Sequence, residues 1–110
     1  MKIQKTEKYT QLKTDQESVH DFFEEFKKMY SKFANEHLII DFSEKININI
    51  EELILFLKIG TQHKESGASF VIVSKNVKLN DLQDEINVVP TFTEALDILE
   101  MEAIERDLGF

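Results

Sequence analysis

Short apolar runs that alternate with segments of helical period constrain the fold of this chain more than any other sequence feature. Leu38 to Phe42 and Phe70 to Val73 are mainly apolar and bounded by polar residues. Runs of this kind are typical of strands buried on both faces. Because a helical segment separates them, the strands are expected to pair in parallel through a right-handed crossover. The pattern therefore predicts an α/β fold.

Further runs extend the predicted sheet. Val88 to Val89, before Pro90, predicts another strand, and Met1 to Lys13 predicts one or two more. A chain of 110 residues suffices for one domain and is too short for two ordinary ones. We therefore expect a single domain over residues 1–110, with a central, mostly parallel sheet of four to five strands and about four helices.

Four segments begin with a small polar residue followed three positions later by Glu or Gln, which is the pattern of a helix N-terminal capping box. The pairs are Thr14 with Glu17, Asn49 with Glu52, Asn80 with Gln83, and Thr91 with Glu94. Val19 to Phe33 then carries apolar residues at spacings of three and four, which predicts one buried stripe. The helix that follows Asn49 is apolar around most of its circumference and is expected to be heavily buried until Gly67 ends it in a left-handed cap.

Composition excludes several functions. The chain has no cysteine, which removes thiol catalysis, Cys-based zinc sites and disulfides, and we expect a cytoplasmic protein. No apolar run is long enough for a membrane span, and no signal peptide is recognisable. The formal net charge is −8, so binding to a polyanion such as nucleic acid is not expected.

The sequence contains no pattern of an enzyme site. His20, His37 and His63 are too scattered for a local metal motif. The three glycines cannot form a phosphate-binding loop, and no serine lies in a nucleophile elbow. We therefore predict a protein that is not an enzyme, without catalytic, metal or cofactor-binding residues.

The stretch from His37 to Leu53, HLIIDFSEKININIEEL, resembles the central signature of STAS domains. This family includes bacterial anti-sigma-factor antagonists and sulfate-transporter tails. Its members have a buried strand ending in Asp-Leu-Ser and, after a short apolar bridge, Asp-Ser-Ser-Gly-Leu at a helix start. Residues 41–43 are similar to the first part and residues 49–53 lie at the second; the resemblance continues to Leu99. It implies a STAS-like fold and a regulator that binds an anti-sigma factor, a kinase-like regulator or a regulated enzyme.

One departure from the family concerns its switch. The serine that a partner kinase phosphorylates in the family corresponds to Glu51, and the glycine after it corresponds to Glu52. The resemblance thus implies partner binding through the loop and helix start at residues 46–53, without the phosphoserine. We name Ile48, Asn49, Ile50, Glu51 and Glu52 as candidate partner-binding residues. Two structural alternatives stay open: the alternating isoleucines 46, 48 and 50 belong to the core, and the carboxylates stabilise the helix start.

The last helical segment has two apolar faces. Phe92, Leu96, Leu99 and Ala103 share one face, and Ile98, Met101, Ile104 and Leu108 lie broadly opposite. Either Met101, Ile104 and Leu108 form an exposed ridge used for partner binding or a homodimer, or the helix breaks near Met101 and the tail folds back.

A second function remains open at the level of sequence. Some STAS-like domains and related α/β folds hold lipids or anions between the sheet and the helices. The abundant phenylalanines could line such a pocket, or they could simply fill the core.

Overall fold

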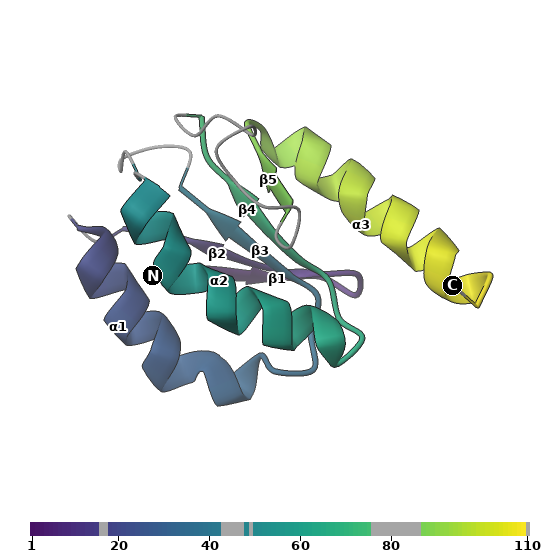
Figure 1. Cartoon of the computed structure of the whole chain (residues 1–110), viewed down its shortest axis with the longest axis horizontal. Coiled ribbons are helices and arrows are strands. Elements are labelled where there is room, and N and C mark those ends of the chain that lie inside the picture. Colours follow the sequence, from purple (N-terminus) through teal and green to yellow (C-terminus); the bar gives the residue numbers. More distant parts are fainter. Residues whose placement is uncertain (16–17, 43–47, 49, 76–86, 110) are drawn as a thin grey trace.

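The computed structural model describes residues 1–15, 18–42, 48, 50–75 and 87–109. It is a mixed α/β structure in which a twisted sheet lies between helices (Figure 1). The elements in chain order are β1 (Lys2–Lys5), β2 (Thr10–Lys13), α1 (Val19–Met29), the 3-10 turn η1 (Tyr30–Lys32), β3 (Leu38–Asp41), α2 (Ile50–Glu65), β4 (Phe70–Val73), β5 (Asn87–Val89) and α3 (Phe92–Asp107).

The sheet has five strands in the order β1-β2-β3-β4-β5. β1 and β2 form an antiparallel hairpin, and each later strand pairs in parallel with the strand before it. Thr10, Leu38 and Phe70 lie side by side across the three central strands. The predicted α/β fold with a mostly parallel sheet is confirmed. The described residues include three α-helices, while the helix predicted after Asn80 lies outside them.

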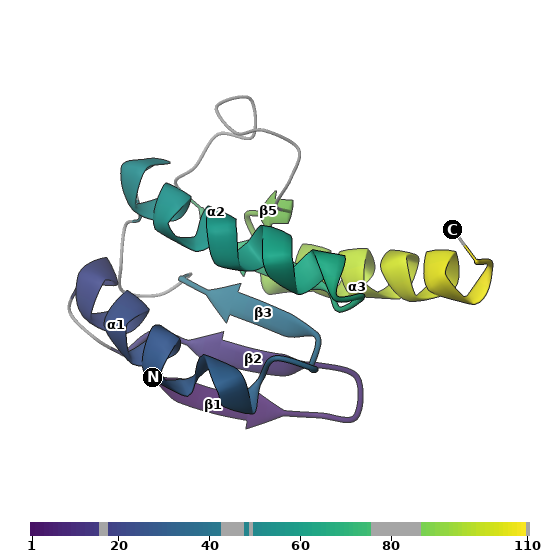
Figure 2. The same ribbon diagram turned by 60° about the horizontal axis from the view of Figure 1, so that its bottom comes forward.

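The helices divide between the two faces of the sheet (Figures 1 and 2). Because right-handed crossovers between strands that advance in one direction place their helices on the same side, α1 and α2 share a face. α3 follows the edge strand β5 and packs on the opposite face, over β4 and β5. Along β3, Leu38 and Ile40 therefore belong to the first face and Ile39 to the second.

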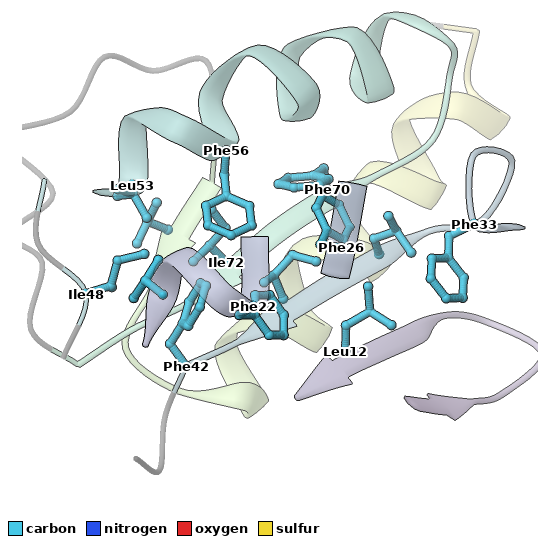
Figure 3. Packing of buried hydrophobic residues seen from close by; sticks show 14 residues of the cluster. Leu12, Phe22, Phe26, Phe33, Phe42, Ile48, Leu53, Phe56, Phe70 and Ile72 are labelled. Atoms are coloured by element: carbon cyan, nitrogen blue, oxygen red, sulfur yellow. The ribbon is translucent and has the colours of Figure 1, made fainter. Parts of the chain in front are cut away.

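Phenylalanine rings fill the space between the sheet and the helices α1 and α2 (Figure 3). Phe56 of α2 lies at their centre, with its ring centroid 5.0 to 6.1 Å from those of Phe22, Phe23, Phe26 and Phe42. Most of these contacts are edge-to-face or tilted, which aromatic rings favour over face-to-face stacking. These rings pack against one another, as the alternative of a phenylalanine-filled core predicts for the phenylalanines placed here.

The first helix begins later than the sequence pattern indicated. The hydroxyl of Ser18, the N-cap of α1, accepts a hydrogen bond from the Asp21 N–H at 3.1 Å. The expected cap at Thr14 is wrong, because α1 begins only at Val19; the Thr14 N–H donates to the Asp41 carbonyl at 3.2 Å and extends the pairing of β2 with β3. At α3 the prediction is confirmed: the Thr91 hydroxyl caps the helix by accepting from the Glu94 N–H at 3.2 Å.

The ends of the other helices also follow local chemistry. Gly67, just after α2, has φ +98° and closes the helix in the predicted left-handed conformation. α3 continues without interruption from Phe92 to Asp107. The alternative in which this helix breaks near Met101 and its tail folds back is therefore wrong.

Candidate functional site

The helix start singled out from the sequence lies at one edge of the sheet. α2 begins at Ile50, at the end of the molecule away from the β1–β2 turn (Figure 1). Glu51 is exposed and Glu52 is half-buried in its first turn, where the helix dipole favours negative charge. Residues 46, 47 and 49 lie outside the described residues, as does the Ile50 side chain. The described side chains of the predicted site are therefore those of Ile48, Glu51 and Glu52.

Ile48 does not belong to this surface. Its side chain is only 2% exposed and packs in the core beside Leu53 (Figure 3). The prediction that Ile48 contacts a partner is therefore corrected, whereas the alternative that it fills the core holds for this residue. A residue sealed under α2 can still position the exposed helix start above it.

α2 has a buried stripe and an exposed stripe on opposite sides. The expectation from the sequence, a helix buried around most of its circumference, is therefore wrong. The inner stripe consists of Leu53, Phe56, Gly60 and His63. The outer stripe, one half-turn away, consists of Glu51, Ile54, Leu55, Lys58 and Gln62. The reason is that α1 and the sheet contact only one side of this helix.

Two large apolar side chains are exposed next to each other on the outer stripe. Ile54 is 53% exposed and Leu55 is 42% exposed. Glu51 and Lys58, one turn before and after them, place a carboxylate and an ammonium group at the borders. We call Glu51, Ile54, Leu55 and Lys58 the α2 patch. Sequence periodicity could not separate its apolar members from the buried ones.

A second exposed apolar surface lies on the outer side of α3. Met101 is 56% exposed, Ile104 is 55% exposed, and Leu108 is also exposed. Asp97 and Glu105 lie on the same side of the helix and are exposed. We call Met101, Ile104 and Leu108 the α3 ridge. On the inner side of the same helix, Ala95 and Leu99 are buried against the sheet.

The β1–β2 turn lies at the opposite end of the sheet from the start of α2 (Figures 1 and 2). Residues of this turn and of α3 line a groove of about 550 Å³. We call it the α3 groove. Its lining is mainly apolar, with charged groups at its borders. The lining residues are Glu7, Lys8, Tyr9, His37, Leu96, Leu99, Glu100, Ala103 and Arg106.

Strand register assembles the groove. Tyr9, His37 and Ser69 each directly precede one of the paired residues Thr10, Leu38 and Phe70, so they lie at the amino ends of neighbouring strands. The Ser69 N–H donates to Nδ1 of His37 at 3.0 Å, and Arg106 of α3 donates from Nη1 to Oγ of Ser69 at 3.2 Å. These residues are far apart in the sequence, so no local motif could indicate the site.

The buried residue His63 has a structural role. His63 is buried; its Nδ1 accepts a hydrogen bond from the Tyr30 hydroxyl and its Nε2–H donates to the Glu36 carbonyl, both at 2.6 Å. Burial lowers the pKa of His63, although the bond to Glu36 opposes this effect. Within the described ranges, no three His, Asp or Glu residues gather as ligands for a metal ion.

The comparisons with known proteins bear on the fold. Neither a scan against protein-family models nor a search of curated proteins finds a match for the sequence. Among solved structures, a candidate anti-sigma factor antagonist from Thermotoga maritima matches with a TM-score of 0.61 and 20% identity, over 90% of this chain and 93% of that one. This chain shares its fold with that protein. The STAS resemblance of the sequence is thereby confirmed at the level of the fold.

No helix of the described part combines the length and the apolar character that crossing a membrane requires.

Proposed function

We propose that this protein is a non-enzymatic regulator, acting in the cytoplasm, that binds another protein through the α2 patch. The observation that carries the proposal is the pair of exposed apolar side chains, Ile54 and Leu55, near the start of α2. Single exposed apolar residues are common on proteins, but adjacent ones with charged borders are typical of interaction sites. The partner would be an anti-sigma factor, a kinase-like regulator or a regulated enzyme.

The chemistry of the α2 patch favours a protein partner over a small molecule. A convex helix stripe offers no concavity in which a small ligand could be enclosed, whereas it fits an apolar groove on another protein. Burial of Ile54 and Leu55 would supply the apolar centre, and Glu51 and Lys58 would contribute at its border. The likeness to a candidate anti-sigma factor antagonist supports the same class of function.

Glu51 makes the proposed interaction constitutive. A carboxylate carries one fixed negative charge, while a phosphoserine adds roughly 1.5 to 2 charges that can be removed again. With Glu51 exposed in the first turn of α2, the partner would always meet an anionic helix start. Control of the interaction would then depend on the amount of protein or on the partner, and not on phosphorylation at this position.

The test compares two pairs of exposed apolar residues. One variant carries Ile54→Gln and Leu55→Gln on α2, and the matched control carries Met101→Gln and Ile104→Gln on α3, where exposure is similar. Each protein is immobilised on a resin and incubated with cell extract of its source organism. The captured proteins are then measured by quantitative mass spectrometry. We expect the α2 variant to lose its specific partner by about tenfold or more, as for a binding hot spot. The α3 variant should retain that partner.

Equal capture by both variants would exclude the α2 patch. Loss only in the α3 variant would transfer the proposal to the α3 ridge, the other candidate surface. Sedimentation of the same two variants tests the proposed homodimer: if the native protein is dimeric, the variant that becomes monomeric identifies the interface. Circular dichroism should show native helix content in both, since all four residues are exposed.

A further inference from the structure

The α3 groove combines an apolar interior with hydrogen-bond donors at one end. Tyr9, Leu96, Leu99 and Ala103 supply apolar surface. The Tyr9 ring packs edge-to-face on Phe92 of α3, with centroids 5.8 Å apart, which ties the turn to the helix. A volume of about 550 Å³ is within the usual range of small-molecule sites, roughly 300 to 1,000 Å³.

The turn that forms one wall is ordered by its own hydrogen bonds. The Thr6 hydroxyl oxygen accepts from the N–H groups of Lys8 and Tyr9, both at 3.1 Å, and the Thr6 N–H donates to the Tyr9 carbonyl at 2.8 Å. The groove is therefore a feature of folded backbone on both sides, which lowers the cost of ordering a binding site.

The side chains of His37 and Arg106 converge at Ser69, which directly precedes β4. Because Nδ1 of His37 accepts a hydrogen bond from Ser69, the neutral ring carries its proton on Nε2 and can donate it. The hydrogen bond to the Ser69 hydroxyl holds the Arg106 guanidinium at the same edge. Both residues line the groove, so an acceptor bound there can receive N–H bonds from each.

We propose that the α3 groove binds a small apolar molecule that carries a single carboxylate, with the carboxylate at His37 and Arg106 and the apolar body along Tyr9, Leu96 and Ala103. Arg106 suits a carboxylate because its planar guanidinium can bond both oxygens. Charge balance favours one negative charge over two: Lys8 and Arg106 face Glu7 and Glu100 around the groove, so a dianion would be repelled by the two glutamates.

This site is separate from the α2 patch and lies at the other end of the sheet (Figure 1). Its ligand would contact the β1–β2 turn, His37 directly before β3, and α3, and it would not contact the outer stripe of α2. The proposal therefore stands whether or not the α2 patch binds a protein.

The experiment uses 2-naphthoate as the probe and 2-naphthalenemethanol as its uncharged analogue. Binding is followed by chemical-shift changes in ¹H–¹⁵N spectra of the full chain. We expect saturable shifts at the groove residues, and affinity about tenfold higher for the carboxylate, since hydrogen bonds to charged groups contribute more than neutral ones. Arg106→Gln should abolish this preference for the carboxylate.

Two tryptophan substitutions on the same helix test the location. Ala103→Trp places a large ring in the groove and should abolish binding, whereas Met101→Trp on the outer side of α3 should leave it unchanged. Both positions are exposed, so both variants are expected to fold. Absence of saturable shifts in the native protein at millimolar probe, or equal effects of the two substitutions, would overturn the proposal.

The pH dependence gives an independent readout. Burial and the charge of Arg106 lower the pKa of His37, while Glu102 opposes them. A bound carboxylate would raise the pKa of His37, so affinity should increase as pH falls from about 7.5 to about 5.5, a range in which an ordinary carboxylate stays ionised. Glu7, Lys8 and Glu100 also face the groove, and His37→Gln separates their contribution. An unchanged pH dependence in this variant would exclude His37 as a ligand contact.

Discussion

The two faces of the sheet are built in different ways. The face under α1 and α2 is closed by interlocking phenylalanine rings, including Phe22, Phe26 and Phe56. In the described part of the chain, the other face is covered by α3, whose buried residues Ala95 and Leu99 pack on the aliphatic strand residues Ile39, Val71 and Val73. The difference indicates that the first face contributes more of the stability, whereas the second leaves an accessible groove beside the helix that covers it.

The outer surfaces of the helices extend the same contrast. α2 packs on both α1 and the sheet, so the backbone that carries its exposed stripe is fixed on two sides. α3 packs mainly on β4 and β5 and meets the end of α2 through the ion pair of Lys64 with Glu102 at 3.8 Å, and its outer side carries the α3 ridge. The following predictions test the contrast, from the largest expected effect to the smallest.

Phe56→Ala should cost about 3 to 5 kcal/mol of unfolding free energy, the usual range for a buried phenylalanine. The ring is fully buried and contacts rings from α1 and from the end of β3, so its removal leaves a cavity between two helices and the sheet. Urea denaturation followed by circular dichroism measures the loss. A cost below that of Leu99→Ala on the other face would contradict the proposed difference between the faces.

Leu99→Ala should cost less, about 2 kcal/mol, the lower end of the range for a buried leucine. Leu99 is slightly exposed and lines the α3 groove, so less apolar surface is lost and water can fill the space that remains. The same denaturation experiment applies. Complete unfolding of this variant would show that the α3 face contributes as much as the other one.

His37 and His63 should make the free energy of unfolding depend on pH to different extents. Their lowered pKa values mean that the unfolded chain binds more protons near pH 6, so stability is complete above the unfolded pKa, about 6.5, and decreases as pH falls below it. Each proton taken up contributes at most about 1.4 kcal/mol per pH unit. We expect His63→Gln to reduce this slope more than His37→Gln, because His63 is the more deeply buried. A larger reduction from His37→Gln would reverse the ranking.

The Met101→Gln, Ile104→Gln pair should change the unfolding free energy by less than about 0.5 kcal/mol, as is usual for exposed positions. Thermal denaturation of this variant next to the native protein measures the effect. A larger loss would mean that the α3 ridge is packed against another part of the protein in solution.

Much of the fold was predictable because local and global preferences agree. The apolar run at Phe70–Val73 became β4 as expected, and Thr91 caps α3 with the hydroxyl that its position suggested. Thr14 was misassigned because a threonine with Glu17 three positions later matches the pattern of a helix cap. In the structure its N–H group donates to the Asp41 carbonyl at the end of β3. Ser18, directly before the apolar stripe and three residues before Asp21, carried the better signal.

The candidate sites were only partly predictable. The pattern of α2 identified a helix but could not show which of its apolar residues are exposed, so Ile54 and Leu55 were expected to be buried. For Ile48 the sequence left a partner contact and a place in the core both open, and the structure places it in the core. The α3 groove was missed altogether, because it depends on strand register that brings Tyr9 and His37 beside Arg106. Burial and register are set by tertiary packing, which one sequence does not display directly.

The sheet order also bears on how the chain acquires its structure. Each strand pairs with the strand that precedes it in sequence, so no strand must wait for a distant segment before it can bond. During synthesis the amino-terminal hairpin, then β3 and then β4 can be added in turn, and α3 comes last. We therefore expect rapid folding for a sheet of this size, with ribosome-bound chains that end before α3 already protecting the amide hydrogens of β2 and β3 from exchange.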